Sequence, residues 1–340
     1  MTIVPKFQRE ATRGSFGAKA PTPADMSAPG PSGDAEAQSK PWPIREILSE
    51  LDDPDAEDLA EPSSEKDVGL AMPKLRLEIR DLNHPGAAKF LAAVNASEVL
   101  RTAVHNVQHH LYHDDAPKDK EAKRDGNNSQ SRRRYRPPPT RSVTVVLRDM
   151  GGVAYTTGTE LDPEHHKEIH VSLPYLSSVH GTITNTNSES PAPSRLAAEA
   201  TGVLTHELVH CYQWNAQGTC PGGLIEGIAD WVRLQCGLSP PHWKREVGGG
   251  TRWDSGYQHT AYFLDYLETR FGSGTVRRIN ARLRNRRYQE AEFWTGLFRR
   301  PVEQLWEDYV AKVGEEARRA EADKTGHLCD EGIQASKTYK

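Results

Sequence analysis

The segment Thr205–Trp214 constrains the fold of this chain more than any other, because it sets two histidines four residues apart in an uninterrupted helical pattern. On a helix, His206 and His210 share one face, one turn apart, as two adjacent metal ligands must. No Gly or Pro interrupts Val203–Trp214. Apolar residues at helical spacing precede the pair: Leu196, Ala200, Val203 and Leu204. We therefore expect a helix with one face in a core and two imidazoles on the other.

Glu207 follows His206 directly and would project beside a metal held by the two histidines. A carboxylate in that place can take a proton from water that the metal polarises. The alternative is a chance pair of surface histidines, but such a pair would lack the amphipathic helix and a third ligand. The pattern indicates a zinc site with Glu207 as the general base.

The third ligand is expected from the next helical segment, where Glu226 and Asp230 are again four residues apart. The first carboxylate can bind zinc while the second accepts a hydrogen bond from a zinc-bound histidine, which fixes its tautomer. The opposite assignment, with Asp230 as the ligand, stays open from ligand chemistry alone. Metzincins instead place a Gly and a third His soon after the pair, where this chain has Gln213 and Ala216.

Hydrolysis also needs a donor for the negative charge that develops on the substrate oxygen. Tyr257, at the start of a helical segment, is the first candidate, and His259 and Tyr262 are the alternates. Taken singly, a tyrosine in such a place is more often a packing residue than an oxyanion donor.

The remaining patterns predict an α+β fold, a small mixed sheet with helices, followed by an α-helical C-terminal part. Alternating residues predict strands at Leu75–Ile79, Ser142–Leu147 and Lys167–Leu173. Apolar residues at helical spacing predict helices at Pro85–Leu111, Ser194–Trp214, Leu224–Cys236, Tyr257–Phe271, Thr275–Arg287 and Val302–Ala320.

The folded domain is expected over residues 73–320, flanked by polar segments. Residues 1–72 are rich in Pro, Ala, Ser, Gly and acidic residues and are expected to be disordered, apart from a short amphipathic stretch at Trp42–Leu51. Residues 113–141 are expected to form a disordered insert, and 321–340 a flexible tail. A mean hydropathy of −0.72 agrees with a globular part diluted by polar segments.

Several classes of protein are disfavoured. The chain has no apolar run of about 18 residues, so we expect no membrane span. It shows no signal peptide, so we expect an intracellular or non-classically secreted protein. Four cysteines, Cys211, Cys220, Cys236 and Cys329, are too few for a disulfide scaffold, and we expect reduced thiols. The basic run Arg132–Arg136 is more typical of a solvated loop than of a nucleic-acid site, so nucleic acid is not an expected partner.

Several segments of the chain are similar to those of a known family. His206–Asn215 and Pro221–Leu234 resemble the basic secretory protein family, also described as peptidases of plants and bacteria. Lys167–Ser172 and Trp253–Asp265 are similar to its members as well. The resemblance covers about 75 to 315, without the insert, and implies a zincin-like fold and peptidase activity. Two features depart from the family, since plant members are secreted and basic, whereas this chain has no signal peptide and a pI of about 6.4.

In zincins an edge strand of the sheet pairs with the extended substrate, and Lys167–Leu173 is the candidate for that strand. An ordinary internal strand fits its alternation equally well.

The function that the residues favour is a zinc-dependent metallopeptidase of the gluzincin type acting on a polypeptide, with His206, His210 and Glu226 as ligands, Asp230 behind them and Glu207 and Tyr257 as catalytic groups. One alternative is a zinc-binding, non-catalytic protein that keeps the fold for defence or interaction, although an intact Glu207 argues against it. Another is an interaction protein that uses Arg132–Arg136 and a structural zinc. Structural zinc usually has four protein ligands, and the spacing here offers three.

Overall fold

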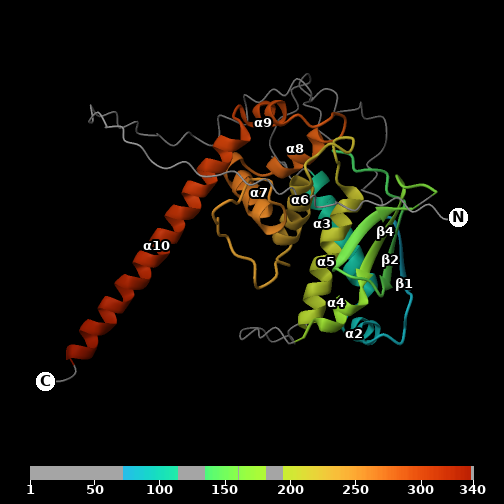
Figure 1. Ribbon diagram of the computed structural model, residues 1–340, viewed down its shortest axis with the longest axis horizontal. Coiled ribbons are helices and arrows are strands. Elements are labelled where there is room, and N and C mark those ends of the chain that lie inside the picture. The colour runs from blue at the N-terminus through green and yellow to red at the C-terminus, as the bar shows by residue number, and fades with distance from the viewer. Residues whose placement is uncertain (1–71, 114–134, 160, 181–193, 338–340) are drawn as a thin grey trace, which may run out of the picture. The chain divides into compact units, whose positions relative to one another are not determined.

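The computed structural model describes residues 72–113, 135–159, 161–180 and 194–337, with side chains described up to residue 322. The expected disordered segment, apart from residue 72, lies outside these ranges, as do most of the expected insert and Arg132–Arg134. The described residues form an α+β fold, as predicted, in which a four-stranded sheet precedes most of the helices (Figure 1).

The sheet is mixed. Its strands are β1 (Lys74–Ile79), β2 (Ser142–Arg148), β3 (Ala154–Gly158) and β4 (His166–Ser172). Their order across the sheet is β1-β2-β4-β3, with β1, β2 and β4 parallel and β3 antiparallel to β4. The three predicted strands are therefore present, and each lies close to its predicted bounds.

β4 pairs with β2 on one side and with β3 on the other. It is thus an internal strand, and the interpretation of this segment as the sheet edge is wrong. The edge is β3, which the sequence analysis did not predict because Ala-Tyr-Thr-Thr-Gly carries almost no aliphatic alternation.

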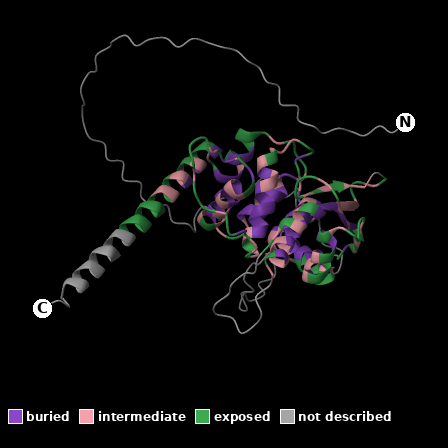
Figure 2. Ribbon diagram, turned by 60° about the horizontal axis from the view of Figure 1, so that its bottom comes forward, coloured by how far each residue is buried: buried purple, intermediate pink, exposed green. Residues whose placement is uncertain are grey.

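One face of the sheet is buried under helices. Val143, Val145, Leu147, Ile169 and Val171 point to that face and are at most 2% exposed. Helices α3 (Ala96–Tyr112) and α5 (Arg195–Tyr212) contact the strands there. Figure 2 shows the buried residues, in purple, gathered in the interior of the described part. This core anchors α5, the helix that carries the histidine pair.

The predicted helix Pro85–Leu111 is in fact two helices, α2 (Pro85–Ala93) and α3. Asn95 divides them, since its side chain accepts a hydrogen bond from the backbone N–H of Glu98 and so begins α3. A short helix, α4 (Leu173–Ser178), follows β4 directly. Pro174 lies in its first turn, as expected of a residue that ends a strand.

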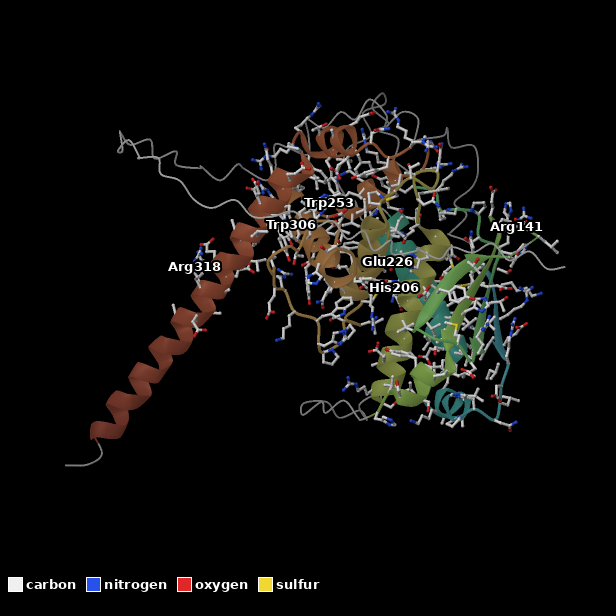
Figure 3. All side chains as sticks on the ribbon, in the orientation of Figure 1. Arg141, His206, Glu226, Trp253, Trp306 and Arg318 are labelled. Atoms are coloured by element: carbon white, nitrogen blue, oxygen red, sulfur yellow. The ribbon has the colours of Figure 1, made fainter. Side chains whose placement is uncertain are left out.

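The C-terminal part is helical, as predicted. It consists of α6 (Gly222–Gln235), α7 (Tyr257–Phe271), α8 (Thr275–Arg282), α9 (Glu290–Phe298) and α10 (Val302–Lys337). α8 ends earlier than predicted, α9 was not predicted, and α10 continues past Ala320. Trp253, Phe263, Trp294 and Trp306 pack together here, and Figure 3 shows Trp253 and Trp306 between α7 and the start of α10.

Two expectations from composition concern the described residues. None of their helices is both long and apolar enough to cross a membrane. Cys211 is buried and Cys220 and Cys236 are partly buried, all three as free thiols, whereas the side chain of Cys329 lies outside the described part.

Candidate metal centre

α5 holds the histidine pair in a rigid, mostly buried position. The Ser194 side chain caps the helix by accepting a hydrogen bond from Ala197 N–H, and residues from Gly202 to Val209 are all buried. The rings of His206 and His210 meet edge to face with centroids 4.8 Å apart. Their Nε2 atoms are 3.1 Å apart, so both nitrogens reach the same point beside the helix.

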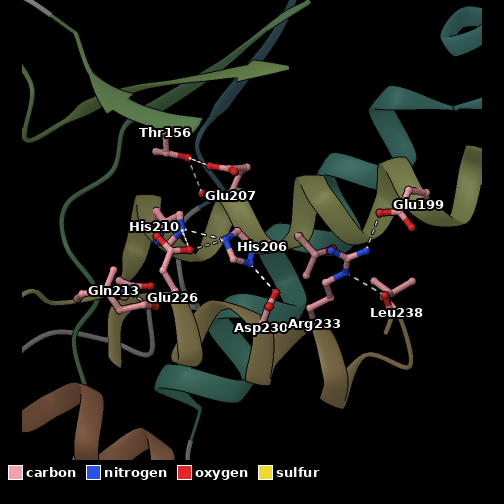
Figure 4. Close-up of polar contacts among 12 residues, drawn as sticks. Thr156, Glu199, His206, Glu207, His210, Gln213, Glu226, Asp230, Arg233 and Leu238 are labelled. Atoms are coloured by element: carbon pink, nitrogen blue, oxygen red, sulfur yellow. Dashed lines mark hydrogen bonds and ion pairs between the residues drawn. The ribbon is translucent and has the colours of Figure 1, made fainter. Parts of the chain in front are cut away.

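α6 brings Glu226 to that point. Glu226 Oε2 lies 3.1 Å from His206 Nε2 and 3.7 Å from His210 Nε2 (Figures 3 and 4). Glycines allow α6 to pack this closely on the chain that leads into α7. A Cβ on Gly223 would overlap the carbonyl group of Asp254, and one on Gly227 would overlap the Thr260 side chain.

The three converging atoms have the chemistry and spacing of a metal-ligand set. Ligands held at about 2.05 Å in a tetrahedron lie about 3.3 Å from one another. The three distances here are 3.1, 3.1 and 3.7 Å, which bracket that value. Within the described residues this is the one group of three or more His, Cys, Asp or Glu side chains arranged to hold a metal ion.

Asp230 fixes the state of His206. Its Oδ1 lies 2.7 Å from His206 Nδ1, so the histidine donates from Nδ1 and turns the lone pair of Nε2 toward Glu226. Lone pairs on two nitrogens and a carboxylate oxygen then face one another, which is favourable when a cation lies between them. Of the two carboxylates on α6, Glu226 faces both Nε2 atoms and Asp230 stands behind His206.

The pKa values of the histidines indicate how strongly these groups interact. Burial lowers the pKa of His206, but hydrogen bonds with Asp230 and Glu226 outweigh it and raise the value to about 9. Burial and the neighbouring His206 lower the pKa of His210 to about 4. The site therefore favours one positive charge next to its carboxylates.

Glu207 lines the same cavity as the two histidines and extends toward the sheet. Its side chain is 6% exposed, and Oε2 accepts a hydrogen bond of 2.7 Å from Thr156 Oγ1 on β3 (Figure 4). Burial raises the pKa of this carboxyl group, while the charge on His206 and the Thr156 hydroxyl oppose the rise. Sequence reasoning missed Thr156, because the strand that carries it has no recognisable pattern.

The three candidate oxyanion donors lie in different places. Tyr257 begins α7 with its ring nearly parallel to that of His206 at 6.4 Å, and its side chain is 58% exposed. Its φ of 47° is left-handed, which is costly for a tyrosine and is typical of functional sites. His259 lines the same cavity as Tyr257. Tyr262 instead packs against Trp243 and Arg245 and is not among the cavity residues.

A long cleft of about 1120 Å³ runs through this site. α5 and α6 form its floor, β3 one wall, and the start of α7 the other, with Asn215, Gly218 and Cys220 at one end and Glu199, Arg233 and Trp243 at the other. Glu199 Oε1 accepts hydrogen bonds from Tyr175 OH and from Arg233 Nη2. This ion pair is a second feature that sequence reasoning missed, since its partners are 34 residues apart.

Comparison with known proteins gives one match. A family model, BSP, described as "Peptidase of plants and bacteria", matches residues 72–309, more than half of the chain. It spans the sheet, the histidine pair, Glu226 and the beginning of α10. No curated protein and no solved structure matches the chain significantly.

Proposed function

We propose that this chain, which belongs to the family of peptidases of plants and bacteria, hydrolyses peptide bonds with the help of a bound zinc ion. The observation that carries the proposal is the convergence of His206 Nε2, His210 Nε2 and Glu226 Oε2 in a long cleft beside a buried glutamate. Two nitrogens and one carboxylate oxygen are a common ligand set of catalytic zinc, in which a fourth position stays open. A histidine pair on one helix and the third ligand on the next is what a gluzincin-like zincin requires, and this supports the assignment that we propose.

A zinc ion bound here would supply a Lewis acid that polarises water and the peptide carbonyl group. We assign the movement of protons to Glu207. Thr156 engages its Oε2, which leaves Oε1 to accept a proton from the attacking water and to return it to the leaving amine. Burial raises the pKa of Glu207, which makes it a stronger base than an exposed carboxylate.

Tyr257 is the donor that we assign to the substrate oxygen. Its ring faces His206 across the cleft, and the preceding Gly256 adopts a φ of 82° and packs against Gly223 of α6. The tyrosine is therefore fixed in place through its backbone, and its exposed side chain extends into the cleft. A hydroxyl held in this way can stabilise negative charge at little cost in reorganisation.

The edge strand β3 is the docking site that we propose for the substrate backbone. Ala154, Tyr155 and Thr156 line the cleft, and the side of β3 away from β4 carries no strand within the described residues. An extended peptide can add to such an edge by main-chain hydrogen bonds, which read no side chains. β3 would then hold the peptide and, through Thr156, the base that acts on it.

A zinc-binding protein without turnover is the alternative. A hydrogen bond that orients a buried Glu207 would serve no purpose in a site that only binds metal, so the geometry favours the enzyme. The test is the cleavage of unfolded casein by the purified chain, with a chelator and then with zinc added back. Zinc-dependent cleavage supports the peptidase, and bound zinc without any cleavage supports the alternative.

A further inference from the structure

An arginine-rich segment lies beside one end of the cleft. Residues 275–289 contain six arginines and neither Asp nor Glu, in a chain whose net charge is −4. The arginines begin in α8 and continue through the turn that leads to α9 (Figure 1). They are Arg277, Arg278, Arg282, Arg284, Arg286 and Arg287. We call the last four the arginine ridge; Arg286 and Arg287 are exposed and the other two are partly exposed.

The ridge is attached to the loop that forms the end of the cleft. Ala216 N–H donates to Leu283 O, Gln217 Nε2 donates to Asn285 O, and Tyr288 N–H donates to Thr219 Oγ1. The guanidinium group of Arg284 lies 5.4 Å above the ring of Trp214. Other residues of the same loop, Asn215, Gly218 and Cys220, line the cleft. The loop at residues 215–220 therefore lines the cleft with some of its residues and binds the segment of the arginine ridge with others.

A segment from far away in the sequence contacts α8, where the arginines begin. Tyr135 lies against Arg277, with the guanidinium carbon 5.9 Å from the ring centre. The neighbouring Arg136 is exposed. Glu292 pairs with Arg286 at 3.5 Å, and both side chains are about half exposed or more, so that pair is weak.

We propose that the arginine ridge binds an acidic stretch of the polypeptide substrate while the cleft holds the bond to be cleaved. This inference rests on the proposed peptidase function. Guanidinium groups pair with carboxylates in a bidentate geometry, and several of them on one surface attract a run of Asp and Glu. A peptide is favoured over a nucleic acid because the loop that carries the ridge also lines the cleft for the substrate chain.

The chain direction of β3 indicates on which side of the scissile bond the acidic stretch lies. β3 begins near α4 and the Glu199 end of α5, since Ser172 N–H donates to Val153 O. It ends near Cys211, where Thr140, next to the start of β2, donates to the Cys211 carbonyl. We take the substrate to add antiparallel to β3, and its N-terminal part then lies over the loop that follows α5. The acidic residues then lie N-terminal to the scissile bond.

The test uses the full chain and three fluorogenic peptides that share one cleavable sequence. One carries four acidic residues on its N-terminal side, one carries them on its C-terminal side, and one is neutral. We expect kcat/KM for the N-terminal acidic peptide to exceed the neutral value by about tenfold, as a few exposed ion pairs provide. In Arg286→Glu/Arg287→Glu this ratio should fall to about one or below, and in the wild type it should fall with added salt.

Arg76→Glu/Arg80→Glu is the matched control, because these exposed arginines lie on β1 and directly after it, at the opposite edge of the sheet, and their reversal should keep the ratio. An equal ratio in wild type and ridge variant overturns the proposal, as does a preference for the C-terminal acidic peptide.

A binding assay tests the ridge independently of peptidase activity. Fluorescence anisotropy of the labelled N-terminal acidic peptide is measured in the presence of a chelator, so that no zinc-dependent cleavage occurs. Binding that the ridge variant loses supports the ridge even if no peptide is cleaved. Binding of single-stranded DNA but not of this peptide would assign the ridge to nucleic acid and overturn the inference.

Discussion

The hydroxyl of Thr156 donates to Oε2 of Glu207 over 2.7 Å, and this bond joins the edge of the sheet to the helix that carries the histidine pair. The residues come from β3 and α5, which are 51 positions apart in sequence. The same hydroxyl lies 3.0 Å from the backbone carbonyl of Glu207, so it can donate to only one of the two oxygens at a time. The wall of the cleft thus takes part in orienting the proposed base.

Replacing Thr156 by valine should slow catalysis without loss of zinc. Valine has the shape of threonine but cannot donate, so Glu207 loses the bond that fixes its orientation. We expect kcat to fall about tenfold, because the base remains but is less well aligned. Steady-state kinetics on a fluorogenic peptide and zinc analysis of the same preparation provide the measurement. Thr157→Val is the control, since Thr157 is the exposed neighbour on β3 and should keep its kcat.

The carboxylates of α6 should differ in their effect on zinc. Glu226→Gln removes a proposed ligand and should abolish stoichiometric binding. Asp230→Asn keeps an oxygen for the His206 Nδ1–H and removes only the charge, so zinc affinity should fall about 10- to 100-fold while saturating zinc restores one ion per chain. Competition with a chromogenic chelator measures both affinities. If Asp230→Asn loses zinc entirely and Glu226→Gln retains it, Asp230 is the ligand.

Removal of zinc should destabilise the contact between α5 and α6. Zinc at about 100 times its dissociation constant stabilises a folded chain by about 2.7 kcal/mol, which corresponds to about 5–10 °C in Tm for a domain of this size. We therefore expect a chelator to lower Tm by that amount in calorimetry. The His206→Ala/His210→Ala chain should melt at the same temperature with and without chelator. A chelator shift that persists in this variant would show that the stabilising metal binds elsewhere.

The parts of the site that the sequence revealed are local. His206, Glu207 and His210 lie within one turn and a half of a helix, and the Glu226–Asp230 pair repeats the same spacing, so helical periodicity alone places them on shared faces. Thr156 and the Glu199–Arg233 pair depend on contacts between distant segments, which no periodic pattern reports.

The fold shows the same division. β2 and β4 were predicted because aliphatic residues alternate along them. Which strand forms the edge of the sheet depends on which strands pair, and here the polar strand β3 pairs with the outer side of β4 and becomes the edge. The arginines of residues 275–289 were visible in the sequence, but their position beside the cleft follows from three hydrogen bonds to the loop at residues 216–219.

Tyr257→Phe should reduce kcat with little change in KM. The hydroxyl is the one polar group lost, and it is proposed to contact the substrate oxygen mainly in the transition state. Loss of one such donor typically costs about 100-fold in kcat. Peptide kinetics measure the effect, and Tyr262→Phe serves as control because Tyr262 packs against Trp243 outside the cleft. Equal kcat values for wild type and Tyr257→Phe would leave His259 as the candidate donor.

The Glu207→Gln variant is the sharpest test of the mechanism. His206 and His210 direct their Nε2 atoms toward Glu226, whereas Glu207, which lines the same cleft, is held by Thr156 of β3. Glutamine keeps the size of the side chain and can still accept from Thr156, so zinc content and Tm should stay close to the wild-type values. It cannot take a proton near neutral pH, and a general base contributes about 100- to 10,000-fold in rate. We therefore expect kcat to fall at least about 100-fold.

The result separates three possibilities, because zinc content, Tm and kcat are measured on the same preparation. A large loss of kcat with full zinc content supports the division of labour between ligands and base. Absence of cleavage in both wild type and Glu207→Gln, with zinc bound in each, supports the non-catalytic protein. Equal cleavage by the two would contradict the proposed mechanism most directly, since it would mean that the activity arises from another site.

The variant Glu199→Gln provides the control, since this second carboxylate of α5 lines the cleft but pairs with Arg233 and Tyr175 rather than facing the histidines. It should retain kcat within about threefold, because it touches none of the groups that move a proton.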